Sequence, residues 1–186
     1  MTKQEKRGRM NGMDLNVLNE TVDAVRKDST LGKCKFRARN KWIDGALNCS
    51  TISDFFAAKQ ELSHREKLEL RADEPPMLAG EDRAANPVEY LLHALASCIT
   101  TSMVAHAAVK GIQIEELESE LEGDIDLNGF LGLNPDVPKG YSDIRVKFRI
   151  KTDPNNLETL KHLSEFSPVF NTIKNGARVG VEFQLK

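Results

Sequence analysis

Cysteine and net charge are both scarce in this sequence, and each scarcity excludes a class of protein. Only three cysteines occur, Cys34, Cys49 and Cys98, an odd number without paired spacing. A disulfide framework needs paired cysteines and a zinc finger needs closely spaced pairs, so we expect free thiols in a reducing, cytoplasmic setting. The 26 basic residues nearly balance the 28 acidic ones. This balance gives no electrostatic reason to expect nucleic acid or an anionic membrane as a partner.

Targeting segments and common cofactor motifs are also missing. The basic N-terminus is not followed by an apolar core, so we expect no secretory signal. The longest apolar region, residues 94–109, contains five hydroxyl or imidazole side chains. It is too short and too polar for a membrane span of roughly 20 apolar residues, and it is typical of a buried core helix. Glycine loops for phosphate, nucleotide fingerprints, HExxH and GxSxG do not occur, so no cofactor is expected.

The residues that are present predict one α+β domain with an N-terminal extension. Residues 1–12 are expected to be disordered and residues 13–28 to form an amphipathic helix. Acidic residues alternate along 117–126 and basic residues along 144–151, so these strands would form cross-strand ion pairs if they are neighbours. Further strands are predicted over 33–39, 46–53, 66–73 and 179–185, with a turn over 40–45, and further helices over 87–110, 154–166 and 169–175.

The predicted helix over 87–110 has clear start and stop signals. Asn86 suits the N-cap, Pro87 the first helical position and Gly111 the position after the end. The helix is apolar nearly all round, which is typical of a helix buried on most sides. A chain of this size can hardly surround such a helix, so we expect a partner subunit to pack against it.

Cys98, in the middle of this helix, is the first candidate for chemistry. A thiolate there could reduce a peroxide or act as a covalent nucleophile if a cation lowered its pKa. Free cysteines more often simply pack in a core, and the spacing alone leaves both readings open. His93 lies five residues before Cys98 and His106 eight after. Neither offset places an imidazole beside the thiol, so a metal site made by His93 and Cys98 is disfavoured and no bound metal is expected.

Two motifs resemble the OsmC/Ohr family of osmotically inducible and organic-hydroperoxide-resistance proteins. The sequence NPVEYLLHALASC, residues 86–98, is similar to the start of that family's central helix. The sequence SPVFNT, residues 167–172, falls where the family carries its second motif. The order of elements also agrees. The resemblance covers residues 32–186, an OsmC-like domain, and leaves residues 1–31 as an N-terminal extension.

The resemblance implies a fold and an activity. Family members are intertwined homodimers in which two antiparallel or mixed sheets wrap around long central helices. Peroxidatic members use a cysteine that Cys98 matches, and the substrates would be small organic hydroperoxides. An arginine that Arg39 matches best, with Arg37 as the second choice, and a glutamate that Glu89 matches would orient the thiolate and the peroxide. An external thiol would supply the electrons for this thiol-dependent hydroperoxide reductase in oxidative or osmotic stress.

The sequence departs from the family pattern at two places. Phe170 stands where the second redox cysteine is expected, so an external thiol, Cys49 or Cys34 would have to resolve an oxidised Cys98. Alternatively, the protein is a non-catalytic, small-ligand-binding or stress-associated dimer with an inert Cys98. Glu89 lies nine residues before Cys98, whereas the family pattern has ten. A loop carboxylate, Glu81 or Asp82, could therefore take its place.

Overall fold

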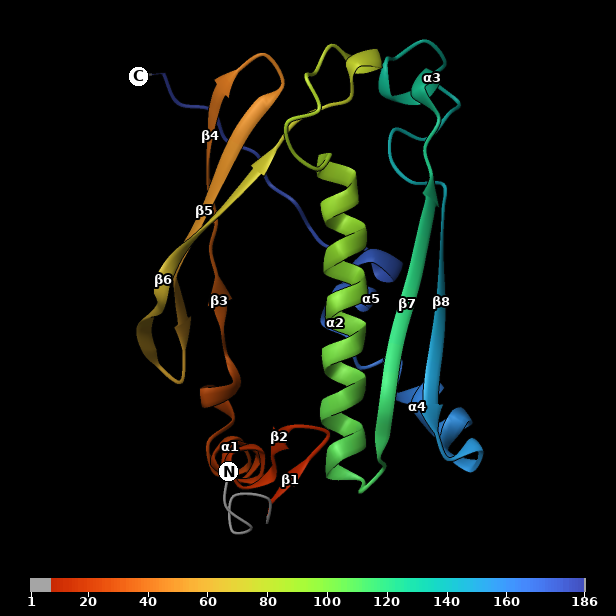
Figure 1. Cartoon of the computed structure of the whole chain (residues 1–186). Helices are drawn as coiled ribbons and strands as arrows, with labels where there is room; N and C mark the ends of the chain where they lie inside the picture. Colours follow the sequence, from red (N-terminus) through yellow and green to blue (C-terminus); the bar gives the residue numbers. More distant parts are fainter. Residues whose placement is uncertain (1–7, 186) are drawn as a thin grey trace. The chain divides into compact units, whose positions relative to one another are not determined.

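The computed structural model describes residues 8–185, and its contacts divide the chain into two compact units. One unit is the continuous segment Asp14–Leu91, and the other combines Met1–Met13 with Leu92–Lys186. The helices and strands of both are labelled in Figure 1. The predicted boundary between an extension, residues 1–31, and a domain, residues 32–186, stays a prediction.

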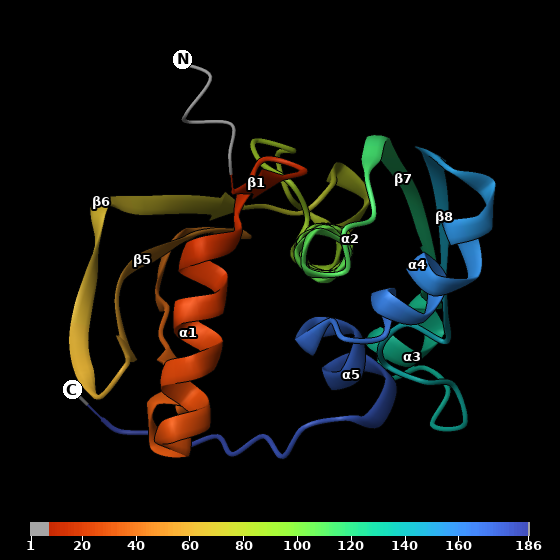
Figure 2. The ribbon, with the colours of Figure 1, turned by 90° about the horizontal axis from the view of Figure 1, so that it is seen from below.

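The unit Asp14–Leu91 contains one helix and a four-stranded antiparallel sheet. Helix α1, Leu15–Lys27, begins at Asp14, whose side chain accepts hydrogen bonds from two backbone N–H groups of the first turn. A short 3₁₀ turn follows, and Figure 2 shows the long curved hairpin made by strands β5 and β6. Strand β5 is central, with β6 on one side and β3 and β4 on the other. The strands are β3 (Lys35–Phe36), β4 (Arg39–Asp44), β5 (Leu47–Ala57) and β6 (Gln60–Ala72).

The helix predicted over 13–28 is confirmed, but the strands differ from the prediction. The predicted turn over 40–45 is wrong, because β4 continues to Asp44 and only Gly45, with φ of 53°, begins the turn. Strands β5 and β6 extend well beyond the predicted ranges and meet at Ala58 and Lys59, with φ of 49° and 63°. Two-residue hairpin turns of this left-handed kind usually contain Asn or Gly. Because Ala-Lys carries no such signal, the sequence did not indicate this hairpin.

The other unit is built from helix α2, a two-stranded antiparallel sheet and two short helices. Helix α2, Pro87–Val109, begins in the first unit and continues into this one. Strands β7 (Ile114–Asp124) and β8 (Asp143–Thr152) pair directly and run beside α2 (Figure 1). The segment between them holds the single turn of α3, Leu127–Phe130. Helices α4 (Leu157–Ser164) and α5 (Pro168–Asn175) follow β8, as predicted.

The core of this unit forms where one face of α2 meets the two short helices and the hairpin. Leu95, Ile99 and Met103 recur at helical spacing on α2 and are buried, as are Leu160 and Leu163 on α4. The apolar residues of β7, β8 and α5 pack against this cluster. The alternating pattern of the two strands thus turns one face of the sheet to the core.

The outward face of the β7–β8 sheet carries the ion pairs that the alternating charges predict. Arg145 Nε lies 2.7 Å from a Glu122 oxygen, and Lys151 Nζ lies 3.1 Å from one of Glu116. Arg145 also pairs with Asp124, and this hydrogen bond lowers the pKa of the Asp124 carboxyl and raises that of the guanidinium. Exposed pairs of this kind add little stability singly. Opposite charges on facing positions nevertheless favour this register over a shifted one.

Expectations at both ends of the chain are wrong. Residues 8–12 are ordered: β1 (Arg9–Met10) pairs with β2 (Met13–Asp14), and residues 1–7 lie outside the described part. Asn11 explains the order, because its side chain donates to the carbonyl of Ile112 and accepts from the N–H of Ile114, both at 2.9 Å. The strand predicted over 179–185 does not form. Its alternating pattern is present, but a strand needs a pairing edge, and Phe183 is 93 % exposed.

Helix α2 is longer than the apolar stretch 94–109 from which the sequence was judged too short for a membrane span. By length and composition alone it could cross a membrane, because it spans 23 residues from Pro87 to Val109 rather than the shorter apolar stretch considered above. Core helices pass the same test. One face of α2 packs against α4 and the β7–β8 sheet, and 28 % of its most apolar window is buried within the described part of the chain.

Candidate functional site

Cys98 lies in the middle of α2, half-buried and with a free thiol. Its neighbour Ile99 faces the core, so Cys98 stands at the edge of the buried face. The nearby hydroxyls are already satisfied by the helix backbone: Ser97 Oγ donates to the carbonyl of His93 at 2.8 Å, and Thr101 Oγ1 donates to that of Ser97 at 3.0 Å. Among the described residues no group hydrogen-bonds to Cys98 Sγ.

Arg39, the predicted arginine, lies at the start of β4 in the unit Asp14–Leu91. Its guanidinium holds both oxygens of Asp54, with 3.2 Å between Nη2 and Oδ2. Arg37, the second choice, donates to both oxygens of Glu61, at 2.7 and 2.9 Å, and also reaches Asp54. Both arginines are therefore paired, and the Arg39 hydrogen bond holds the pKa of the Asp54 carboxyl well below its usual range.

Asp54 and Glu61 were not singled out from the sequence. A register shift between Ile52 and Asp54 interrupts the pairing of β5 with β6. Irregularities of this type re-aim side chains, and strict alternation cannot place a residue that follows one. The only signal in the sequence is that acidic residues follow, in the next two strands, the basic residues Arg37 and Arg39. Arg37, Arg39, Asp54 and Glu61 thus form one cluster of two cations and two anions, drawn from β4, β5, β6 and the residues between β3 and β4.

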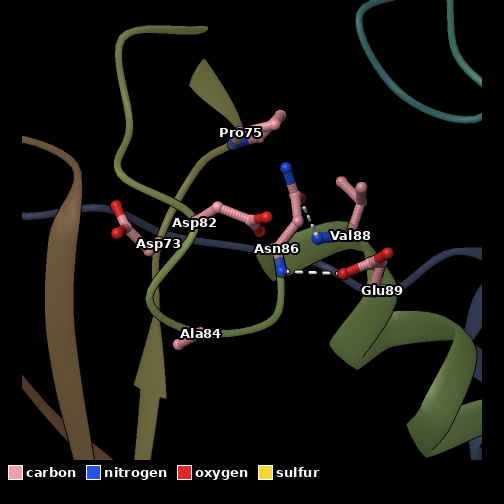
Figure 3. Close-up of a pocket in the computed structure, with 7 residues that line it drawn as sticks. All are labelled: Asp73, Pro75, Asp82, Ala84, Asn86, Val88 and Glu89. Atoms are coloured by element: carbon pink, nitrogen blue, oxygen red, sulfur yellow. Dashed lines mark hydrogen bonds between the residues drawn. The ribbon is translucent and has the colours of Figure 1, made fainter. Parts of the chain in front are cut away.

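The loop before α2 forms a pocket of about 210 Å³ lined by residues 73–89 (Figure 3). Asp73 is buried and anchors the loop: its carboxylate accepts from the backbone N–H groups of Glu74 and Arg83, and from Arg83 Nε at 3.3 Å. Burial raises the pKa of this carboxyl, but the three hydrogen bonds outweigh it and the pKa is lowered. Gly80 lies against the carbonyl of Glu74, where any side chain would collide. The loop conformation is thus fixed by its own sequence.

Glu89 lies at this pocket together with Asp82, so the structure brings two of the three candidate carboxylates together. The Glu89 carboxylate accepts a hydrogen bond from the backbone N–H of Asn86 at 2.9 Å. In turn the Asn86 side chain accepts from the N–H of Val88 at 2.9 Å. Together these two bonds cap the start of α2 in the manner of a capping box, with the Asn86 side chain bound to Val88 in place of Glu89, as Figure 3 shows. The third carboxylate, Glu81, pairs instead with Arg83.

The spacing on α2 separates Glu89 from Cys98. Nine residues correspond to about 14 Å along a helix axis and to about half a turn around it. Glu89 and Cys98 of one helix therefore point to opposite sides at different levels. The catalytic role of Glu89 stays a prediction. The structure shows in addition that Glu89 caps the start of α2.

The remaining candidates are dispersed. Cys34 is exposed and Cys49 is half-buried on β5, and both are free thiols. Phe170, at the expected position of a second cysteine, lies on α5 and lines an apolar cavity together with Ile99, the neighbour of Cys98. His93 is exposed on α2. Across residues 8–185, no group of three or more His, Cys, Asp or Glu side chains could hold a metal ion.

A comparison with known protein families shows to which family the chain belongs. A family model described as OsmC-like protein matches residues 80–182, more than half of the chain. The chain belongs to the OsmC-like family. The matched region contains the whole of α2, the β7–β8 sheet, α4 and α5. A search of curated proteins finds no significant match.

Solved structures share the fold at low sequence identity. An OsmC-like protein from Mycoplasma pneumoniae is 18 % identical, with a TM-score of 0.57 over 76 % of this chain and 89 % of that one. An organic hydroperoxide resistance protein OsmC from Legionella pneumophila is 20 % identical, with a TM-score of 0.50 over 75 % and 90 %. An OsmC-like protein of unknown function from Vibrio cholerae is 15 % identical, with a TM-score of 0.52 over 74 % and 92 %. At these identities the comparison establishes the α+β fold.

Proposed function

We propose that this protein reduces organic hydroperoxides in stress defence, with Cys98 as its only catalytic thiol. The observation that carries the proposal is the half-buried, free Cys98 on the central helix of an OsmC-like domain. The similar Legionella pneumophila protein is an organic hydroperoxide resistance protein, which supports the same reaction class. The three free thiols fit a reducing, cytoplasmic compartment.

The reaction needs one thiol on the protein and two from outside. The Cys98 thiolate attacks the outer peroxide oxygen, the O–O bond breaks, and the alkoxide takes a proton to leave as an alcohol. Cys98 is now a sulfenic acid. A first external thiol displaces water and forms a mixed disulfide, and a second thiol attacks this disulfide and returns Cys98 to its reduced form. Because Phe170 replaces a second cysteine on α5, the external thiols take over the resolving step.

The protein would act as a homodimer. The tail 177–185 carries Val179, Val181, Phe183 and Leu185 in alternation, all at least 71 % exposed. Strand β6 presents thirteen residues with an unpaired outer edge within the described sheet. An alternating segment without a partner and a long free edge fit a strand exchanged between two copies. Trp42 and Phe36, 68 % and 78 % exposed on the same sheet, would also be covered in such a dimer.

In a dimer, Glu89 and Arg39 would act on a Cys98 thiol. Because Glu89 points away from Cys98 of its own helix, a catalytic Glu89 would serve the Cys98 of the second copy. Arg39 would stabilise the thiolate, since Asp54 occupies only part of its five N–H donors. Both residues would position the thiolate and the peroxide for attack, and Asp82 or Glu81 would replace Glu89 if Glu89 serves only as a cap.

Peroxide turnover by cysteine variants tests the proposal. Purified protein is mixed with cumene hydroperoxide and a dithiol, and peroxide loss is followed for wild type, Cys98→Ser, Cys49→Ser and Cys34→Ser. We expect turnover in wild type and in the Cys49 and Cys34 variants, and none in Cys98→Ser. Loss of turnover in Cys49→Ser or Cys34→Ser as well would identify an internal resolving thiol and overturn the one-cysteine mechanism. No turnover in wild type above a protein-free control would overturn the enzyme and leave the non-catalytic, ligand-binding dimer.

A further inference from the structure

A second cavity lies between α2, β8, α4 and α5, entirely within the unit that contains Cys98. Its volume of about 440 Å³ falls in the range of roughly 300–1,000 Å³ that is usual for small-molecule sites. Cys98 is not among the lining residues, although its neighbour Ile99 is. None of the candidate catalytic residues Cys98, Arg39 and Glu89 lines this cavity. Its apolar lining consists of Ile99, Met103, Val146, Phe148, Ile150, Leu157 and Phe170.

The polar lining of the cavity comes from a single helix. Glu158, Lys161 and Ser164 follow one another at intervals of three residues on α4, so Lys161 neighbours each of the other two on the helix surface. Ser164 Oγ donates to the carbonyl of Lys161 at 2.6 Å, which leaves its oxygen able to accept. Among the described residues, neither Glu158 nor Lys161 forms an ion pair, with each other or elsewhere. The polar side of the lining therefore offers one unpaired anion and one unpaired cation, both solvent-exposed, and one half-buried hydroxyl acceptor beside the apolar residues.

We propose that this cavity binds an apolar α-amino acid, with the carboxylate at Lys161, the ammonium group at Glu158, and the side chain in the apolar chamber. The charges select this class. A fatty acid would place its carboxylate beside Glu158, and an alkylamine would place its ammonium beside Lys161. A zwitterion satisfies both, and the two side chains lie about one helical turn apart, close enough to share one small head group. The chamber accommodates a side chain as large as that of phenylalanine.

Phe170, which stands in place of the second cysteine, also lines this cavity. A cysteine at this position would serve redox chemistry, whereas the phenylalanine ring supplies an apolar wall to the cavity. Lys174 Nζ lies 5.4 Å from the centre of that ring, on the same helix. The side chain that stands in place of the second thiol thus forms part of the cavity wall, and the inference does not depend on peroxide reduction.

Binding of L-phenylalanine and of two truncated analogues tests the proposal. Equilibrium dialysis with the full-length protein compares L-phenylalanine with 3-phenylpropionate, which lacks the ammonium group, and with phenethylamine, which lacks the carboxylate. We expect L-phenylalanine to bind at least threefold more tightly than either analogue. Along alanine, valine and leucine, each added methylene that the chamber buries should tighten binding by about fourfold.

Two variants assign the charges. Lys161→Gln should weaken the binding of L-phenylalanine and of 3-phenylpropionate by about threefold to tenfold. The binding of phenethylamine should not change, because only the partner of the carboxylate is lost. Glu158→Gln should weaken the binding of L-phenylalanine and of phenethylamine and leave the binding of 3-phenylpropionate unchanged. Lys139→Gln removes a cation from the loop before β8 and is the matched control. Cys98→Ser should bind as wild type does, so binding is scored independently of peroxide reduction.

The proposal is overturned by any of three results: no saturable binding of L-phenylalanine, equal binding of the three ligands, or an equal effect of Lys161→Gln on phenethylamine and 3-phenylpropionate. Tighter binding of 3-phenylpropionate than of L-phenylalanine would instead identify a site for simple carboxylates. Wild type that binds L-phenylalanine but does not turn over peroxide would refute the proposed function and leave this inference intact.

Discussion

Glu89→Gln is the substitution that best separates catalysis from folding in this protein. In the structure the Glu89 carboxylate caps α2 by accepting the N–H of Asn86 at 2.9 Å. Glutamine accepts the same hydrogen bond, and both residue types serve at this position of a capping box. Glu89→Gln should therefore keep the helix start while removing the negative charge. Glu89→Ala removes both the cap and the charge.

The expected magnitudes follow from this contact. Loss of the cap in Glu89→Ala should cost about 0.5–1 kcal/mol, which corresponds to about 1–4 °C in the melting temperature of a chain of this size. Glu89→Gln should melt within about 1 °C of wild type. If Glu89 also positions the thiolate and the peroxide, kcat/KM for cumene hydroperoxide should fall by at least about tenfold in both variants, because the charge is lost in both.

Subunit mixing then tests where Glu89 acts. Under the proposal Cys98→Ser is inactive and Glu89→Gln keeps at most about a tenth of wild-type activity; the two proteins are denatured together and refolded at equal amounts. If Glu89 serves the thiol of the second copy, one site in each mixed dimer is intact and about a quarter of wild-type activity returns. If Glu89 served its own Cys98, none would return. Wild-type kcat/KM in Glu89→Gln would refute the catalytic role and reduce Glu89 to a helix cap, with Asp82→Asn as the next variant.

Three further predictions concern stability and assembly. The Lys59 hydrogen bond lowers the pKa of Asp28 to about 2. The stabilisation is therefore complete above the unfolded value near 3.8 and is lost as the pH falls through 2, so Asp28→Asn should lower the melting temperature at pH 7 but not at pH 1.5. Leu160→Ala should cost about 3 kcal/mol in urea unfolding, because this side chain is fully buried; a cost below about 1 kcal/mol would contradict the described core. Phe183→Asp should shift light scattering from dimer to monomer, whereas an unchanged mass would contradict strand exchange by the tail.

Local rules placed most helices correctly. Asn86, Pro87 and Gly111 set the limits of α2 because capping depends on neighbouring residues alone. The alternating charges of β7 and β8 likewise predicted their pairing, since the side-chain period of a strand is local and opposite charges align two strands. The hairpin of β5 and β6 was missed because Ala58 and Lys59 adopt left-handed conformations without a residue type that favours them.

The candidate site was only partly accessible to such reasoning. The motif around Cys98 identified the thiol, and the family match to residues 80–182 agrees with that motif. The partners of the other candidates came from contacts between distant residues. Asp54 of β5 meets Arg39 of the neighbouring β4, and Glu89 turns back to Asn86 instead of toward the thiol.

By itself, then, the sequence determined the helix limits, the strand alternation and the position of the thiol at Cys98, because each depends on residues within a few positions of one another. Tertiary structure alone decided what surrounds them: the paired state of Arg39, the cap formed by Glu89, and the cavity that Phe170 and Lys161 line. The physical reason is that charge pairing and cavity shape depend on which distant segments pack together, and local side-chain periodicity carries no information about that packing.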